Sequence, residues 1–361
     1  MPIRYPRVKS GKDINILKHF YLPEEAEIAL GMSFKMETAE EIAARLKHKD
    51  IEEVRTHLYN MVKKASVIYR KENELFGLVP FVVGMFEFQI KRISKDYLKL
   101  TFGYIAERFA FEFLTTKKPQ TRIIPLNQKI ENQHKIQSYD EYFNLIKNSA
   151  GRLVAIDCIC RTAKDHFGKP CEISDRRETC LALRDYADLA EINEWGRKIS
   201  LEEAMDLARQ NQEEGLVIQS ANDQNPNFIC ACCKDCCGLL SMFKAVPHPA
   251  EYVASNYSAS VDMNTCVGCT LCVKICPMDA IYIHDKKAFI LKDRCIGCGV
   301  CTIKCPKNSI SLIPRKKNTV PPETVDDLYD ELSKSRINPD KKATLIFRFI
   351  KQIIIKKFKT G

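Results

Sequence analysis

The order of apolar and polar positions predicts a run of short helices and a hairpin near the start of the chain. A first helix is expected from Pro23, and Thr38 with Glu41 has the spacing of a capping box. A further helix is predicted over 51–65, because its apolar residues recur on one face. Two strand-like segments follow, joined by four polar residues: 66–70 and 75–79.

Three helices followed by a hairpin resemble a winged helix-turn-helix. In a DNA-binding protein of that kind the third helix would read the bases. Here the third helix carries mixed charge, from Glu52, Glu53, Arg55, His57, Lys63 and Lys64. Many winged helices serve as packing or protein-contact modules instead. We therefore do not expect nucleic acid as a partner, and keep DNA binding as an alternative.

Further helices are expected downstream of the hairpin. The segment 82–116 is rich in Phe, and its spacing favours core packing over an aromatic ligand site. One helix is predicted around 139–148, and a helix pair within 181–216, with Ser200 as a helix N-cap. Near the end, 345–358 has an apolar stripe flanked by lysines, which predicts an amphipathic helix.

The C-terminal helix has three interpretations. It packs on its own protein, docks on a partner subunit, or lies on an anionic membrane surface as a peripheral contact. Of the last two, docking on a partner subunit is favoured over membrane binding. No run of 18 apolar residues predicts a transmembrane span, and the N-terminus has no signal-peptide pattern.

All 17 cysteines of the 361 residues lie between Cys158 and Cys305. Their CxxC spacing indicates metal sites in a reducing compartment, so we expect a cytoplasmic protein. The composition, 45% hydrophobic and 28% charged, is that of an ordinary globular protein. The net charge of +10 is spread thinly and identifies no partner.

Two stretches repeat the pattern C-x2-C-x2-C-x3-C-P, which is the spacing that holds [4Fe–4S] clusters. The fourth cysteine of each run is too distant to close its own ring and ligates the other cluster. One predicted cluster, the first ferredoxin set, is held by Cys266, Cys269, Cys272 and Cys305. The other, the second ferredoxin set, is held by Cys295, Cys298, Cys301 and Cys276.

These runs resemble the bacterial two-cluster ferredoxin fold over about 258–315, and strands are expected at 280–284, 288–291 and 309–313. The resemblance implies low-potential, one-electron transfer. A zinc module is the alternative. It is disfavoured because zinc ligand pairs are separated by longer spacers, without a third cysteine at the next x2 position.

Nine more cysteines lie upstream: Cys158, Cys160, Cys171, Cys180, Cys230, Cys232, Cys233, Cys236 and Cys237. Free thiols in such number would be oxidation-prone, so we expect metal ligation, with one or two further clusters. A zinc site built from part of this set is the alternative. The arrangement resembles multidomain ferredoxin-containing iron–sulfur proteins of anaerobes, although no chemistry follows from that resemblance.

Three other residues near these cysteines are weaker candidates. Arg161 could donate to cluster sulfides or lie on the surface, and His166 and His248 could be ligands. No dinucleotide fingerprint, P-loop or nucleophile elbow is present, so no site for two-electron chemistry is apparent from the sequence.

We therefore predict an α+β protein with four parts. They are a winged-helix-like and helical domain (1–150), a cysteine-rich cluster-binding domain (151–257), a two-cluster ferredoxin domain (258–320), and a linker with the amphipathic helix (321–361). It would pass electrons to a partner oxidoreductase, and is more an electron carrier than an enzyme. The alternatives are a redox-responsive DNA-binding regulator and a catalytic oxidoreductase with an unusual cluster within 158–237.

Overall fold

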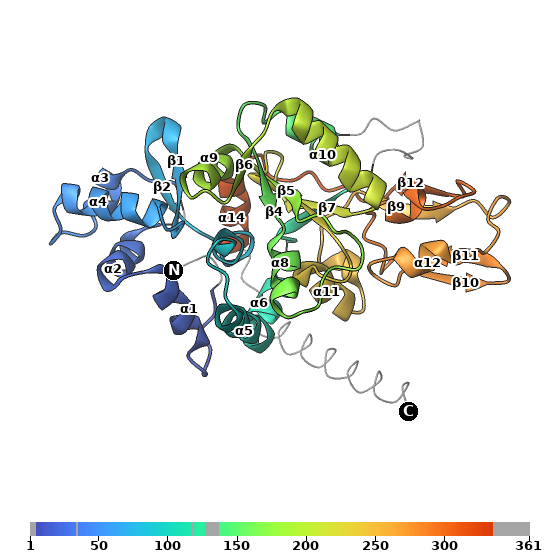
Figure 1. Cartoon of the computed structure of the whole chain (residues 1–361), viewed down its shortest axis with the longest axis horizontal. Helices are drawn as coiled ribbons and strands as arrows, with labels where there is room; N and C mark the ends of the chain where they lie inside the picture. The colour runs from blue at the N-terminus through green and yellow to red at the C-terminus, as the bar shows by residue number, and fades with distance from the viewer. Residues whose placement is uncertain (1–4, 34, 117, 127–136, 335–361) are drawn as a thin grey trace.

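The computed structural model describes residues 5–33, 35–116, 118–126 and 137–334. Helices of the N-terminal part lie at one end, a sheet occupies the centre, and the segment with the two cysteine runs lies at the other end (Figure 1). The amphipathic helix predicted at 345–358 falls outside the described residues. None of the helices within them is both long and apolar enough to cross a membrane.

The N-terminal part contains the predicted helices and hairpin. In the capping box, the Glu41 N–H donates to Thr38 Oγ1 at 3.2 Å, and the Thr38 N–H donates to the Glu41 carboxylate at 2.9 Å. The hairpin strands pair in antiparallel register, with Val67 opposite Leu78. The elements are α1 (Lys12–Phe20), α2 (Pro23–Gly31), α3 (Ala39–Ala43), α4 (Ile51–Val62), β1 (Val67–Arg70) and β2 (Leu75–Leu78).

The hairpin is tied to the central part of the molecule. Arg70 donates to Asp185 at 2.9 Å, and Arg152 bridges the same carboxylate at 2.9 Å and Glu72 at 3.0 Å. Asp185 lies in α9 (Arg184–Ile192), which packs on β1. These contacts give the hairpin a packing role, although the winged-helix resemblance itself stays a prediction.

The Phe-rich segment forms short helices that lie between the N-terminal part and the sheet. Phe86, Phe88, Phe109 and Phe113 are buried, as expected for core residues, whereas Phe102 is 39% exposed. The helices are η3 (Glu87–Gln89), α5 (Lys95–Tyr104), η4 (Ile105–Phe109) and α6 (Ala110–Leu114), and they follow the segment η2 (Phe81–Met85), whose central residues are not helical.

The central sheet has six strands in the order β3-β7-β8-β5-β4-β6, with antiparallel neighbours throughout. The sequence did not predict these strands. Strand β3 precedes the predicted boundary at residue 150, yet pairs with β7. The strands are β3 (Thr121–Ile124), β4 (Leu153–Asp157), β5 (Glu178–Leu183), β6 (Gly196–Lys198), β7 (Val217–Ala221) and β8 (Phe228–Cys232).

Helices cover this sheet. The predicted N-cap Ser200 accepts from the Glu203 N–H at 3.1 Å, and the predicted helix near 139–148 is also present. The described helices of this part are η6 (Ser138–Asp140), α7 (Tyr142–Lys147), α8 (Ile159–His166), α9, α10 (Leu201–Glu214), α11 (Gly238–Ala245) and η7 (Pro249–Glu251).

The C-terminal part has two two-stranded antiparallel sheets and three helices. Strands β10 and β11 pair as predicted, and β12 pairs with β9, a strand the sequence did not predict. The elements are β9 (Tyr257–Val261), α12 (Leu271–Ile275), β10 (Ile281–His284), β11 (Lys287–Ile290), α13 (Val300–Ile303), β12 (Ile310–Pro314) and α14 (Val325–Lys334).

A buried ion pair joins the sheet to the C-terminal part. Arg122 in β3 donates to Asp140 at 2.8 Å, and both side chains are fully buried. Asn256 donates to the second oxygen of that carboxylate at 2.8 Å, and Arg122 also reaches the Thr319 carbonyl at 2.9 Å. Four distant segments therefore meet at one charge pair.

We predict that Asp140→Leu lowers the free energy of unfolding by about 3–5 kcal/mol, because it leaves the buried Arg122 charge unpaired. Urea denaturation of anaerobically purified protein measures this. The double variant Arg122→Met with Asp140→Leu should lose clearly less. Equal losses in the single and double variants would contradict the argument.

Candidate metal centres

Each cysteine run is shaped by a glycine with a left-handed backbone. Gly268 and Gly297 have φ of 67° and 69°. A Cβ at Gly268 would lie 2.3 Å from the Lys286 carbonyl oxygen, and one at Gly297 would lie 2.2 Å from that of Tyr257. Because a side chain would clash in both places, the C-x-G-C turns need glycine for space as well as for conformation.

The eight cysteines of the runs surround two separate cavities of about 20 Å³ each. The cysteines lining the first cavity are Cys266, Cys269, Cys272 and Cys305. Those lining the second are Cys276, Cys295, Cys298 and Cys301. Each cavity thus gathers three cysteines of one run and the fourth of the other, which is the grouping expected from the sequence.

Backbone N–H groups point at sulfurs in the same way in both halves. Ala288 donates to the Cys266 sulfur and Ala259 to the Cys295 sulfur, both at 3.4 Å. Likewise Ala280 donates to Cys276 and Ser309 to Cys305, both at 3.3 Å. Such N–H donors favour the thiolate form and are among the factors that set a cluster's reduction potential.

The two sets differ in exposure. In the first set Cys269 is exposed, and the neighbouring Val267 and Leu271 are 56% and 42% exposed. In the second set Cys295, Cys298 and Cys301 are buried, and Cys276 is partly buried. A cluster in the first set would therefore lie nearer to solvent.

Six of the nine upstream cysteines line one cavity and lie next to one another around it, and we call them the six-thiol ring. Around this six-thiol ring the order is Cys158, Cys180, Cys230, Cys232, Cys237 and Cys160. They come from the start of α8, from β5 and β8, and from the start of α11.

Sheet register brings the ring together. Leu181 in β5 pairs with Ile229 in β8, so the next positions along, Cys180 and Cys230, face each other. Because successive side chains of a strand point to opposite faces, Cys232 lies on the same face of β8 as Cys230. The helices α8 and α11 deliver the remaining thiols from their first turns.

Proximity and burial govern the ionisation of these thiols. Contact with the neighbouring sulfurs, followed by burial, raises the pKa of Cys160 well above its ordinary value. Contact with Cys158 and Cys230 lowers the pKa of Cys180 instead. A ring of this kind cannot carry six negative charges by itself, whereas metal ions bind thiolates and would supply the compensating charge.

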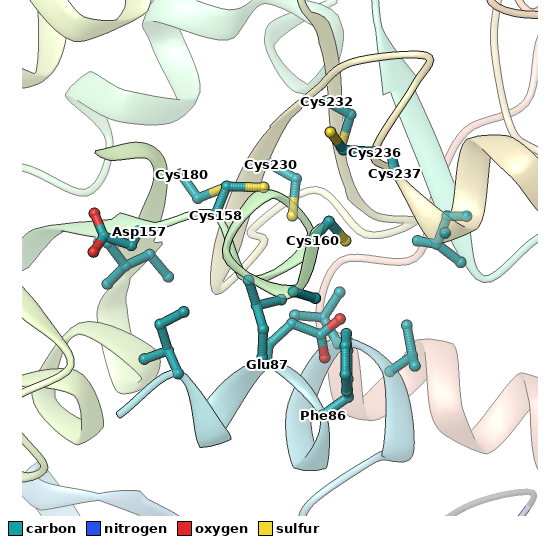
Figure 2. A pocket seen from close by; sticks show the side chains of 18 of the residues that line it. Phe86, Glu87, Asp157, Cys158, Cys160, Cys180, Cys230, Cys232, Cys236 and Cys237 are labelled. Atoms are coloured by element: carbon teal, nitrogen blue, oxygen red, sulfur yellow. The ribbon is translucent and has the colours of Figure 1, made fainter. Parts of the chain in front are cut away.

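The ring opens on a large cavity of about 510 Å³ (Figure 2). Apolar side chains form most of its wall, among them Phe86, Phe88, Phe102 and Phe109. The sequence predicted core packing for these phenylalanine side chains, and the structure shows in addition that they line a cavity. The volume of this cavity is far larger than that of either cavity in the cysteine runs.

Glu87 is a polar residue of this wall that the sequence did not single out. Its carboxylate accepts the Gly84 N–H at 2.8 Å, and burial raises its pKa to about 7. A carboxyl group that is partly protonated near neutral pH can supply protons within the cavity. A single glutamate among phenylalanines gave no sequence signal, because only folding brings it beside the thiols.

The remaining three upstream cysteines form a second group, one member of which, Cys236, also lines the cavity beside the ring. The sulfurs of Cys171, Cys233 and Cys236 and a carboxylate oxygen of Asp235 all lie within 4.8 Å of one another. The nine cysteines therefore divide into six and three. Counting thiols along the sequence does not indicate this division.

Arg161 is fully buried between the two groups, which rules out the surface position considered from the sequence. It donates to Thr179 Oγ1 at 2.5 Å and to the Ala231 carbonyl at 3.4 Å. His166 and His248 belong neither to the ring nor to the Cys171 group, and His248 lies 3.7 Å from Asp293.

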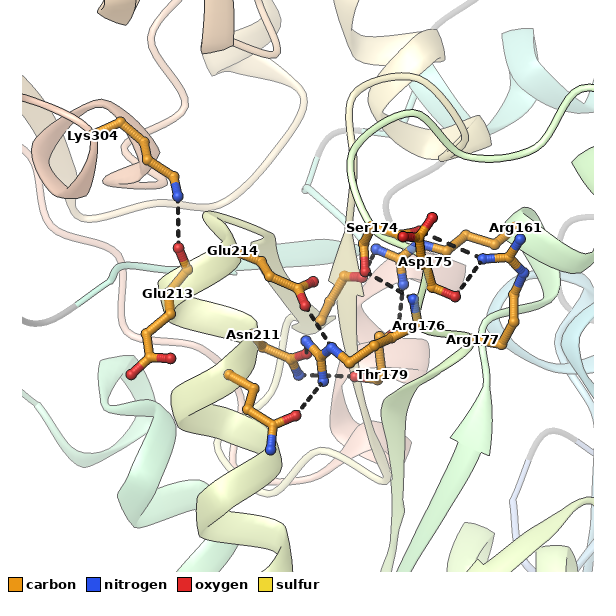
Figure 3. A network of polar contacts seen from close by, with 12 residues as sticks. Arg161, Ser174, Asp175, Arg176, Arg177, Thr179, Asn211, Glu213, Glu214 and Lys304 are labelled. Atoms are coloured by element: carbon orange, nitrogen blue, oxygen red, sulfur yellow. Dashed lines mark hydrogen bonds and ion pairs between the residues drawn. The ribbon is translucent and has the colours of Figure 1, made fainter.

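Polar contacts hold the cysteine-bearing loop against α10 (Figure 3). Arg176 donates to Glu214 at 2.6 Å and to Asn211 at 2.8 Å. From the other side, Lys304 beside Cys305 donates to the Glu213 carbonyl at 2.7 Å. The C-terminal end of α10 thus contacts both cysteine-rich parts.

Residues 265–310 match the family described as the 4Fe-4S dicluster domain. This match lies within the predicted ferredoxin domain and contains all eight cysteines of the two runs. No curated protein and no solved structure matches the chain. The chain therefore carries a 4Fe-4S dicluster segment.

The crossed grouping of cysteines predicts which double variants lose iron. Cys276→Ser with Cys295→Ser removes two ligands of one cluster, so we expect the loss of about four iron atoms. Cys276→Ser with Cys266→Ser damages both clusters, and about eight should be lost. Iron and sulfide assays on anaerobic protein measure the difference. The opposite pattern would mean that each run binds its own cluster.

Proposed function

We propose that this protein passes single low-potential electrons between a donor and a partner oxidoreductase through [4Fe–4S] clusters. The observation that carries the proposal is the pairing of two four-cysteine cavities within a segment that matches the 4Fe-4S dicluster domain. Two clusters so close in one small unit form a path for one-electron steps.

The difference in exposure supports a direction for that path. A donor would meet the first ferredoxin set, because Cys269 is exposed and is flanked by the exposed apolar side chains of Val267 and Leu271. From there an electron would pass to the buried second set. Lys234 donates to the carbonyl of Lys274, which lies midway between Cys272 of the first set and Cys276 of the second, so the 230–237 segment lies beside both sets. The middle-domain thiols would then form the inner end of the path.

Proteins are the expected partners. Three basic side chains on or beside α4 are paired with acids: Arg55 lies 2.5 Å from Glu40, Lys49 lies 2.7 Å from Glu53, and Lys64 lies 2.7 Å from Glu25. Basic side chains that are paired with acids contribute little net positive charge to attract DNA phosphates, which disfavours the DNA-binding alternative. Docking through the predicted C-terminal helix, and a cytoplasmic location, remain part of the proposal.

Anaerobically purified protein should contain at least about eight iron atoms and as much labile sulfide for the two clusters. Its reduced state should give an EPR spectrum of interacting [4Fe–4S]⁺ spins, and Cys269→Ser should abolish the interaction by removing one cluster. Reduced protein should then return one electron per cluster to a one-electron acceptor. Stoichiometric zinc without labile sulfide in the dicluster segment would overturn the proposal.

A second candidate function is reduction of a small apolar molecule in the middle domain. The observation that favours it is the cavity of about 510 Å³, whose size and apolar lining are typical of ligand sites. Electrons would arrive through the clusters, and Glu87 would supply protons from the wall. This is the catalytic alternative kept open from the sequence.

Filling the cavity tests this candidate. Ile105 lines it, whereas the next residue, Ala106, is exposed. With reduced viologen as donor, a nitroarene takes up two electrons and two protons to give a nitroso compound and water. We expect Ile105→Trp to slow this turnover at least tenfold and Ala106→Trp to leave it unchanged, at equal iron content. Equal rates in both variants would assign the reduction to exposed clusters.

A further inference from the structure

Cys171, Cys233, Cys236 and Asp235 form a compact group that the six-thiol ring does not include. The Cys171 sulfur lies 3.4 Å from the Cys233 sulfur and 3.7 Å from a carboxylate oxygen of Asp235. Cys171 comes from the loop after α8, while the other three residues belong to the turn that follows β8. Two segments far apart in the sequence thus bring four donor atoms to one point.

The spacing of these donors fits a single metal ion. Zinc binds sulfur at about 2.3 Å and carboxylate oxygen at about 2.0–2.2 Å in a tetrahedron, so neighbouring donors stand about 3.4–3.8 Å apart. In a cubane cluster each thiolate binds a different iron, which spreads the sulfurs more widely. Throughout the described residues, which include both ferredoxin sets, no other group of three or more potential ligands lies within 4.8 Å.

We propose that Cys171, Cys233, Cys236 and Asp235 bind one zinc ion, separate from every iron–sulfur cluster of this chain. Four protein ligands leave no open position, as in a structural zinc site. All three thiols are buried, with 7%, 3% and 9% of their surfaces exposed. The inference does not depend on the proposed electron-transfer function.

The surroundings of the carboxylate support ligation. While one oxygen of Asp235 faces the Cys171 sulfur, the other accepts the Glu172 N–H at 2.8 Å. A second hydrogen bond of this kind fixes the orientation of a ligating carboxylate. Glu172 directly follows Cys171, so the loop that supplies one ligand also positions another.

The charge of the neighbourhood fits as well. Three thiolates and a carboxylate around a divalent ion leave an excess of negative charge. The fully buried Arg161 guanidinium donates to neutral oxygens, and no carboxylate within the described part of the chain lies within 4.0 Å of it. A buried cation needs an anionic neighbour. Thiolates of the zinc site and of the six-thiol ring would be that neighbour.

The zinc ion would tie the loop after α8 to the turn after β8. That turn lies directly between Cys232 and Cys237, two members of the six-thiol ring. Fixing it would hold the ring in shape without any change of oxidation state, because zinc is not redox-active. The site therefore has a structural role beside a redox centre.

Full-length protein, purified anaerobically from cells grown with both iron and zinc, tests the proposal. We expect one zinc atom per chain, and zinc-edge X-ray absorption should show three sulfur ligands and one oxygen ligand. Cys171→Ser should lose the zinc and keep at least nine-tenths of the iron. The matched control Cys160→Ser, in the six-thiol ring, should keep the zinc.

Asp235→Asn is a milder variant that serves if Cys171→Ser does not fold. It should release zinc to a chromogenic chelator at least tenfold faster than the parent protein does. Loss of about four iron atoms from Cys171→Ser would show that these residues bind a cluster. Zinc that stays in both variants, or iron in its place, would also overturn the proposal. The EPR signal of the dicluster segment reports separately on the electron-transfer function.

Discussion

The constraint on which this structure depends is the charge of buried thiolates. A thiolate that is taken out of water must be balanced by a metal ion, a hydrogen-bond donor or a buried cation. The molecule supplies donors at the ferredoxin sets, where backbone N–H groups of Ala288, Ala259, Ala280 and Ser309 point at sulfurs. In the middle domain it supplies Arg161, fully buried without a carboxylate partner in the described residues.

The two ways of balancing thiolate charge occur in two different architectures. In the dicluster segment, short turns wrap around small cavities, and the two halves repeat the same backbone arrangement. In the middle domain, the register of β5 and β8 fixes three of the ring thiols, the helices α8 and α11 supply the others, and a cavity lies beside them. A small repeated unit suits electron passage, whereas a rigid sheet beside a cavity suits a centre that acts on something bound.

The rest of the fold serves to keep these parts together. The ion pair of Arg122 and Asp140 joins β3 to the segments around Asn256 and Thr319. At the other end, Arg70 and Arg152 bind the N-terminal hairpin to α9 through Asp185. A mutation that loosens the Arg122–Asp140 junction would change the distance between the thiols of the sheet and those of the dicluster segment.

The sequence alone determined what depends on neighbouring residues. The C-x-G-C spacing, the capping box at Thr38 and the β10–β11 hairpin follow from turns and helix ends, whose physical cause lies within a few residues. Only the tertiary structure decided how the nine upstream thiols divide. Cys180 meets Cys230 through the register of β5 and β8, and Cys171 meets Cys233 across 62 residues. Sequence periodicity carries no information on such pairings, because packing between distant segments sets them.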